Sequence, residues 1–255
     1  MPADIVIIPC RSDNYAYLMR DSDSGHVALV DAPEAAPILA ALADRDWPLD
    51  TILITHHHGD HVEGVAEIRG ATGARVIGAA ADAARLPPLD SAVHEGDTFA
   101  LGALEAHVYD VSGHTVGHIA FHVPAAGAVF TADSLMTLGC GRLFEGTADM
   151  MWDSLSKLAA LPAETLVYTG HEYTQANARF AVTVDPDNPD LKARVEEIDR
   201  LRAQGKPTVP TSLATELATN PFLRAADPAI RAHLGMETAS DVQVFAEIRA
   251  RKDRF

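Results

Sequence analysis

The sequence predicts a layered α/β domain followed by a helical C-terminal unit. Short β-branched runs bounded by Gly, Asp and Pro recur through the first two thirds of the chain, as is typical of strands. Helical patterns lie between several of these runs, and strands mixed with helices indicate a layered α/β domain. After about residue 174 the strand signal stops. We therefore expect an α/β domain over residues 1–174 and a helical unit over residues 175–255.

The expected strands are short, apolar and bounded by turn residues. In chain order they lie at 4–10, 26–32, 51–56, 74–79, 104–111, 118–123, 128–133 and 165–171.

The expected helices follow from apolar residues at helical spacing. Those of the α/β domain lie at 34–43, 62–69 and 149–160, the last with Met150, Leu155, Leu158 and Ala159 on one face. In the C-terminal unit, Leu191, Val195, Ile198 and Leu201 repeat between Pro189 and Gly205. Further helices are expected at 227–235 and 240–255, with Ser240 as the N-cap of the last one.

Composition excludes several classes of protein. A chain of 255 residues that is 47% hydrophobic can bury a substantial core. Its net charge of −16 argues against a nucleic-acid partner, which requires a basic face. Two cysteines are too few for a disulfide framework, and no apolar run reaches the ~18–20 residues of a membrane span. We expect a cytoplasmic protein without a membrane partner, and slightly favour a monomer.

The stretch THHHGDH at 55–61 concentrates four histidines and an aspartate directly after the apolar run 52–54. Residues two apart on a strand point the same way, so His56 and His58 share a face while His57 points to the other. Gly59 permits a turn, after which Asp60 and His61 begin the next helix. These nitrogen and oxygen ligands suit a divalent metal ion.

A histidine cluster can also be solvated or cap a helix without binding metal. Further candidates at the ends of later strands favour a metal site: His114 and His118 in SGHTVGH, Asp133 in FTAD, and His171 in TGHEYT. Two neighbouring ions need a bridging group, and Asp133 is the expected bridge because a carboxylate can bridge where imidazole cannot easily do so. Strand geometry alone does not decide between His114 and His118.

The motifs T-H-H-H-x-D-H, S-G-H-T-x-G-H, F-T-x-D and G-H-E-Y-T, in this order, resemble the metallo-β-lactamase superfamily. Within it the chain resembles the glyoxalase II family, the hydroxyacylglutathione hydrolases. The stretches GCGRLFEGTADMMWDSL, NPF and RKDRF also look like that family, so the resemblance runs from about residue 5 to the last residue. It implies an αβ/βα sandwich with a C-terminal all-helical domain.

The resemblance also implies a division of the metal ligands. It assigns His56, His58 and His114 to one ion, assigns Asp60, His61 and His171 to the other, and makes Asp133 the bridge. Two divalent ions, with zinc preferred and iron or manganese as alternatives, would hold a bridging hydroxide that Asp60 helps to orient.

Other residues are expected around these ligands rather than among them. His118 and His57 should support the site, and Asp31 and Glu172 are candidates to accept hydrogen bonds from ligating histidines. The remaining histidines match no motif and should be ordinary surface or core residues: His26, His94, His107, His122 and His233. Cys140 is expected to be a small residue in a tight loop.

The last seven residues, RARKDRF, hold four of the chain's 20 Lys+Arg residues. They form a locally positive end in a chain that is acidic as a whole. Cations also favour a helix C-terminus, and charge alone does not choose between that role and ligand binding. The resemblance implies that Arg249 and Lys252 hold the glycine carboxylate of glutathione, with Arg142 and Tyr173 as further contacts. Two positions depart from the family pattern, because Glu63 and Ala132 replace residues that are usually glycine.

The resemblance implies hydrolysis of S-2-hydroxyacylglutathione, such as S-D-lactoylglutathione, to glutathione and a 2-hydroxy acid. That reaction is the second step of methylglyoxal detoxification. The nearest alternatives are a lactonase or another thioesterase on the same scaffold, and a mononuclear-iron persulfide dioxygenase. A closed structural metal site and a nuclease are disfavoured by the lack of cysteine ligands and by the acidic charge.

Overall fold

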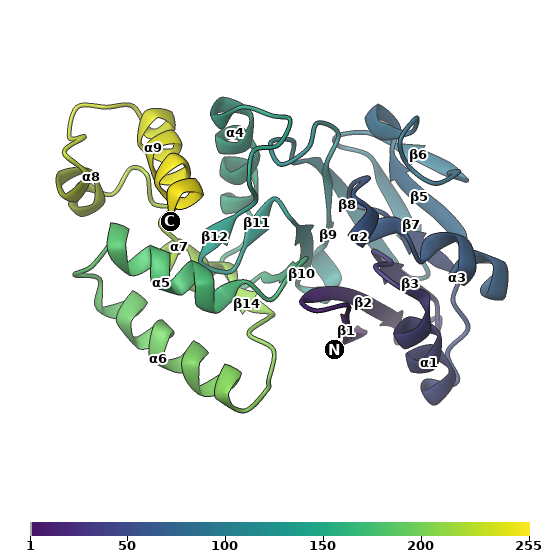
Figure 1. The fold of residues 1–255 in the computed structure, drawn as a ribbon. Coiled ribbons are helices and arrows are strands. Elements are labelled where there is room, and N and C mark those ends of the chain that lie inside the picture. The colour runs from purple at the N-terminus through teal and green to yellow at the C-terminus, as the bar shows by residue number, and fades with distance from the viewer. Residues whose placement is uncertain (1) are drawn as a thin grey trace.

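Two six-stranded mixed sheets stack face to face in the computed structural model, which describes residues 2–255 (Figure 1). In spatial order, the first sheet contains β1 (Ala3–Cys10), β2 (Asn14–Asp21), β3 (Val27–Val30), β4 (Thr51–Leu53), β5 (Arg75–Ala79) and β6 (Ser91–Val93). The second contains β14 (Thr211–Ser212), β13 (Leu166–Thr169), β10 (Ala128–Ala132), β9 (Ile119–Val123), β8 (Leu104–Asp110) and β7 (Thr98–Leu101). A small hairpin, β11 (Leu135–Met136) and β12 (Gly139–Cys140), follows β10.

The core between the sheets is apolar and partly aromatic. Tyr17 and Leu53 from the first sheet pack with Phe121 and Phe130 from the second. The outer faces of most strands are also buried, and burial on both faces explains their nearly continuous apolar sequences.

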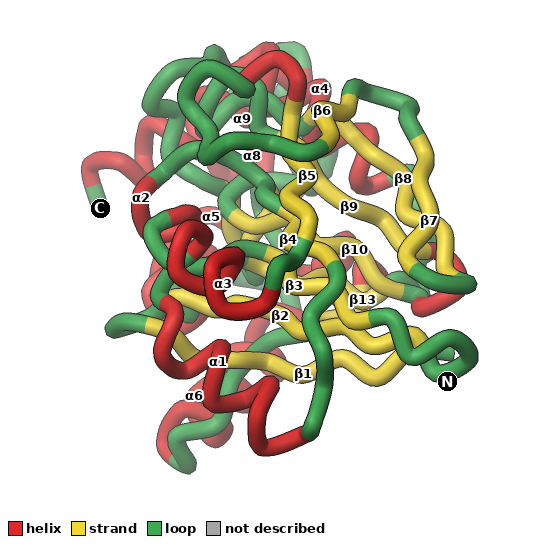
Figure 2. Tube along the Cα trace, turned by 90° about the vertical axis from the view of Figure 1, so that its right-hand side faces the viewer, coloured by secondary structure: helices red, strands yellow, loops and turns green. Residues whose placement is uncertain are grey.

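Helices cover the outer faces of both sheets. On the first sheet lie α1 (Ala35–Arg45), α3 (Val65–Thr72) and the single turn α2 (Gly59–Val62); on the second lies α4 (Ala148–Ala159). Figure 2 shows α1 and α3 in red in front of the strands of the first sheet. The order of layers is therefore helix, sheet, sheet, helix, which confirms the expected sandwich.

The C-terminal segment is helical, as expected, and forms the left part of Figure 1. It comprises α5 (Thr174–Val184), α6 (Pro189–Ala203), α7 (Leu213–Thr219), α8 (Pro228–Leu234) and α9 (Asp241–Arg254). Ser240 caps α9 as predicted, in a reciprocal capping box with Gln243. Among the described residues, 2–255, no helix is long and apolar enough to cross a membrane.

The structure corrects several details of the sequence prediction. The buried face of α4 contains Leu155 and Leu158 as predicted, but Met151 and Ser154 complete it, whereas Met150 and Ala159 are only half-buried. The predicted elements omit β2, β6, β7, α5, α7 and the β11–β12 hairpin. The C-terminal segment also adds the short strand β14 to the second sheet, where it pairs with β13.

Glu216 in α7 is a fully buried carboxyl. Its Oε2 atom accepts hydrogen bonds from the Leu138 N–H and from Asn220 Nδ2, both at 2.9 Å. Burial raises the pKa of Glu216 from 4.5 to about 7, so the folded chain binds this proton more tightly than the unfolded chain does. This contribution to stability is therefore full below pH 4.5 and is lost as the pH rises through about 7.

Glu216→Gln should remove this pH dependence. Only the wild type loses this contribution as the pH rises. The free energy of unfolding of the variant minus that of the wild type should therefore increase by about 3 kcal/mol from pH 4.5 to pH 8. Urea unfolding of both proteins across that range measures the difference, and a constant difference would contradict the prediction.

Candidate metal centre

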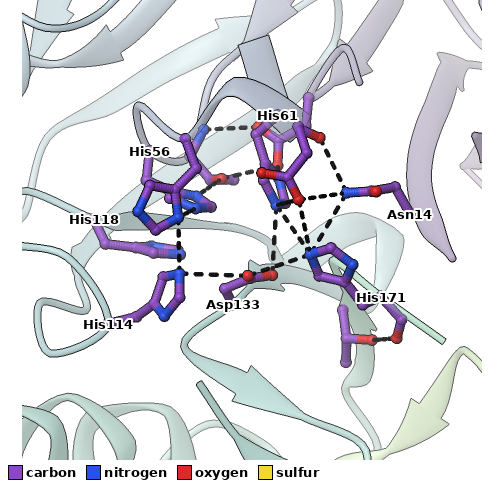
Figure 3. Close-up of polar contacts among 12 residues, drawn as sticks. Asn14, His56, His61, His114, His118, Asp133 and His171 are labelled. Carbon is purple, nitrogen blue, oxygen red and sulfur yellow. Dashed lines mark hydrogen bonds and ion pairs between the residues drawn. The ribbon is translucent and has the colours of Figure 1, made fainter. Parts of the chain in front are cut away.

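Ligand-type side chains from four separate segments converge at one edge of the sandwich (Figure 3). Residues 56–61 follow β4, Asp133 follows β10, His171 follows β13, and His114 lies in the loop between β8 and β9. Their ligand atoms form three groups, each within 4.8 Å: His56, His58 and His114; His56, His61 and Asp133; Asp60, His61 and His171. All seven predicted metal ligands are therefore brought together.

Asp133 lies between the two ends of this cluster. Its Oδ2 is 3.4 Å from His114 Nε2 and 3.3 Å from His171 Nε2, and its Oδ1 is 3.6 Å from His61 Nε2. Burial alone would raise the pKa of Asp133, but His61 and His171 outweigh it and hold that pKa well below the ordinary value. Asp133 is thus an ionised carboxylate at the centre of a ring of imidazoles.

Two observations show that these residues fit a cation. Asp133 Oδ1 is buried and accepts no hydrogen bond from the described residues. His58 Nδ1 faces His56 Nε2 at 3.2 Å and His114 Nε2 at 3.0 Å, while burial lowers the pKa of His56, His58 and His114 and favours neutral rings. Burial alone would lower the pKa of His61 and His171, but Asp133 outweighs it and raises both, so these two rings must release a proton when they bind a metal. Imidazole nitrogens that converge with carboxylates in this way are a donor set typical of divalent metal sites.

Hydrogen bonds to the far ring nitrogens orient three of the histidines. His61 Nδ1 lies 2.7 Å from Asp31 Oδ2, and His171 Nδ1 lies 2.8 Å from Asp13 Oδ1. His114 Nδ1 lies 2.8 Å from the Arg142 carbonyl. When Nδ1 donates to these oxygens, the Nε2 lone pair is left pointing at the cluster.

Sequence reasoning named Asp31 for this role but missed Asp13 and Asn14. Glu172, the other candidate, accepts hydrogen bonds from Tyr15, Thr208 and Arg202, and from no histidine among the described residues. Asn14 Nδ2 donates to both the carbonyl and Oδ2 of Asp60, at 3.0 Å each. The sequence prediction omits β2, so it did not include the turn between β1 and β2 where Asp13 and Asn14 lie.

The supporting histidines lie around the cluster. His118 stacks on His56 with ring centroids 4.5 Å apart, and, unlike His114, it belongs to none of the ligand groups found among residues 2–255. His57 points away and contacts Asp82 at 2.8 Å. The five histidines without a motif match belong to none of the three ligand groups.

A cavity of about 440 Å³ opens from this cluster toward the helical unit. Its walls include all four predicted substrate residues: Arg142, Tyr173, Arg249 and Lys252. The Tyr173 ring stacks on His171 with centroids 4.6 Å apart, so it joins the cavity to the candidate metal centre.

The three cations of the cavity differ in their surroundings. Arg249 is buried and donates to the Cys140 carbonyl and to Asp253, both at 2.9 Å. Burial and the nearby Arg249 lower the pKa of Lys252 to about 8, and its Nζ donates to the Ala176 carbonyl at 3.1 Å. Arg142 is largely exposed at the rim.

Family models cover nearly all of the chain. One described as Metallo-beta-lactamase superfamily matches residues 11–171, and one described as Hydroxyacylglutathione hydrolase C-terminus matches residues 172–255. A protein of Ruegeria pomeroyi named hydroxyacylglutathione hydrolase is 66% identical over 255 residues and covers 100% of both chains. The chain belongs to the hydroxyacylglutathione hydrolase family. A relative of the same name from Rhodobacter capsulatus is 54% identical, again with 100% of each chain covered.

Solved structures show the same superfamily fold. ETHE1 from Myxococcus xanthus has a TM-score of 0.66 and 26% identity, with 98% of this chain and 90% of that chain covered. The protein TTHA1623, solved in a di-iron-bound form, has a TM-score of 0.63 and 25% identity, with 86% and 100% covered. The superfamily fold and the His/Asp clusters together indicate divalent metal binding.

Glu63 and Ala132, the two residues predicted to depart from the family pattern, have different structural settings. Glu63 forms an ion pair with Arg11, which ties the turn before Asn14 to helix α2. Ala132, directly before Asp133, has a φ of +42°, in the left-handed region that favours glycine. The chain thus holds a strained residue next to the central carboxylate.

Ala132→Gly should change the free energy of unfolding by less than about 1 kcal/mol. Relief of left-handed strain, about 1–2 kcal/mol, offsets the lost methyl burial and the greater freedom of the unfolded chain. Ala128→Gly, in the same strand and also buried, lacks this relief and should cost about 1–2 kcal/mol. Equal losses for the two variants in urea unfolding would contradict strain at Ala132.

Proposed function

We propose that this protein is a binuclear metal-dependent thioester hydrolase that cleaves S-2-hydroxyacylglutathione, such as S-D-lactoylglutathione, to glutathione and D-lactate. In this role it would catalyse the second step of methylglyoxal detoxification. The observation that carries the proposal is the position of Asp133 between two sets of histidines, at the floor of a cation-lined cavity. Full-length relatives named for this activity support it.

In the proposed site, His56, His58 and His114 would hold one ion, Asp60, His61 and His171 would hold the other, and Asp133 would contribute to both. We propose zinc, with iron or manganese as alternatives, since His/Asp ligation accepts all three. The di-iron form of TTHA1623 supports a pair of ions in this fold. Such ions lower the pKa of bound water to roughly 7 and polarise a carbonyl oxygen.

The chain's own residues position the reactants. Asn14 holds the Asp60 carboxylate by a hydrogen bond to Oδ2, so that Asp60 can accept a hydrogen bond from the attacking water and orient it. Tyr173, stacked on His171, forms a wall that orients the thioester. A thiol has a pKa of about 8.5, so glutathione can leave as the thiolate without a general acid.

Substrate recognition is proposed to come from the helical unit. In a chain of net charge −16, Arg249, Lys252 and Arg142 place three cations around one cavity. Arg249 and Lys252 would bind the glycine carboxylate of glutathione, since ionic hydrogen bonds to a carboxylate are roughly twice as strong as neutral ones.

Both free cysteines are buried, which suits a protein of the reducing cytoplasm.

An assay of the purified, metal-loaded protein with S-D-lactoylglutathione tests the proposal. We expect thioester loss with stoichiometric release of glutathione and D-lactate. Absence of turnover by fully loaded protein would overturn it. Hydrolysis of a lactone without any of the thioester would favour the lactonase alternative, and oxygen consumption with a persulfide would favour the dioxygenase.

A further inference from the structure

The β11–β12 hairpin joins two parts of the candidate centre. It begins at Leu135, two residues after Asp133, and Arg142, two residues past its end, supplies the carbonyl that lies 2.8 Å from His114 Nδ1. At its base, Gly141 N–H donates to the Ser134 carbonyl at 3.1 Å. A Cβ on Gly141 would lie 1.9 Å from the Asp133 carbonyl oxygen, so this base is packed as closely as the backbone allows. A shift of the hairpin therefore moves the segments that carry Asp133 and orient His114.

The tip of the hairpin is inserted into the helical unit. Leu138 has a left-handed backbone, with a φ of +54°, and is fully buried. Its side chain packs in a small apolar cluster with members from α5 and α6, namely Ala178, Ala181, Leu191 and Ile198.

Side chains of the helical unit also bind the hairpin backbone. Asn220 Nδ2 donates to the Met136 carbonyl at 3.1 Å and to the Gly139 carbonyl at 3.0 Å. Glu216 Oε2 accepts from the Leu138 N–H and from Asn220 Nδ2, so it links the tip of the hairpin to its two strands.

Two more contacts extend this arrangement along the hairpin. Asn177 Nδ2 donates to the Thr137 carbonyl at 3.0 Å, and Arg249 donates to the Cys140 carbonyl. Thus the carbonyls of residues 136, 137, 139 and 140 and the N–H of residue 138 all bind side chains from the helical unit.

A carboxyl is not the residue that would stabilise this buried position most. Burying a carboxyl carries a desolvation penalty, and packed apolar residues often stabilise a core as well as or better than buried charged groups. A fully buried carboxyl that binds the N–H of a left-handed residue instead specifies one conformation of the hairpin.

We propose that Glu216 is a positioning residue that fixes the β11–β12 hairpin, and through it the placement of Asp133 and His114 relative to the cations of α9. Its expected effect on catalysis rests on the proposed function; its effect on the hairpin does not.

The test compares Glu216→Ala, Glu216→Gln and a matched control, Ile230→Ala. Ile230 is fully buried in α8, outside the hydrogen bonds to the hairpin, so its truncation destabilises the helical unit without touching this network. Three quantities are measured on each metal-loaded protein: amide exchange of residues 134–142 by mass spectrometry, metal content, and kcat and KM for the thioester.

We expect Glu216→Ala to speed exchange in residues 134–142 and to lower kcat/KM by about 10–100-fold, the range typical for residues that orient metal ligands. Glu216→Gln retains an acceptor for the Leu138 N–H and should stay within about threefold of the wild type. Ile230→Ala should lower the Tm but leave hairpin exchange and kcat/KM within about threefold. If Glu216→Ala does not fold, Glu216→Asp replaces it, since its carboxylate ends one methylene short of Leu138.

The proposal is overturned if the alanine (or aspartate) variant matches Ile230→Ala in hairpin exchange and kcat/KM, or if Glu216→Gln is as impaired as Glu216→Ala. Failure of the proposed function is distinct, because wild-type protein would then show no thioester turnover. The exchange comparison, which needs no substrate, would still decide the role of Glu216.

Discussion

Replacing Asp133 with alanine is expected to lower kcat/KM for S-D-lactoylglutathione by about 10³-fold and to reduce bound metal, since the carboxylate that both ions would share is lost. His61, His114 and His171 all point at this carboxylate from distances of 3.3–3.6 Å. Without it, the buried imidazoles face one another with no anion between them, and two neighbouring cations would repel each other.

Asp153→Ala is the matched control for this change. Its side chain is 77% exposed on α4 and pairs only loosely with Lys157, at 3.8 Å. We expect its kcat/KM and metal content to stay within about twofold of the wild type. Steady-state kinetics and metal analysis of both variants measure the effect, and an active Asp133→Ala enzyme would rule out a shared carboxylate.

Replacing Lys252 with methionine is expected to raise KM about 10–100-fold while kcat changes little, because a charge-assisted hydrogen bond is worth about 1.5–3 kcal/mol. Lys252 lines the cavity beside Arg249, and methionine keeps its apolar stem. Lys192→Met, on an exposed position of α6, is the control and should leave KM unchanged.

The substrate provides a second control for this prediction. The thioester of γ-glutamylcysteine lacks the glycine carboxylate, so wild type and Lys252→Met should hydrolyse it with similar KM. Because the pKa of Lys252 is lowered to about 8, the wild-type KM for the full thioester should also rise above that pH, while the KM of the variant should not. A KM difference that persists on the shortened substrate would show that Lys252 does not bind the glycine carboxylate.

Residues whose chemistry is local in sequence were predictable. His56 to His61 follow an apolar strand within six positions, and the alternation of a strand already separates His57 from His56 and His58. The cap at Ser240 could be predicted for the same reason, since both partners lie within one helical turn.

Contacts between distant segments could not be predicted from sequence in this way. Asp13 and His171 are 158 residues apart, and nothing near either residue indicates the other. The hairpin that follows Asp133 is equally non-local, because it is held by Asn177, Glu216 and Asn220 from the helical unit. A sequence pattern identifies the residues that chemistry requires, whereas the partners that orient them depend on the packing of the two units.

The proposed pair of ions is tested most directly by metal analysis of the fully reconstituted protein and of His171→Ala. We predict about two divalent ions per wild-type chain and about one in the variant, because His171 belongs to only one of the two proposed ligand sets. A single ion in the wild type, or two ions retained in His171→Ala, would contradict the proposed centre.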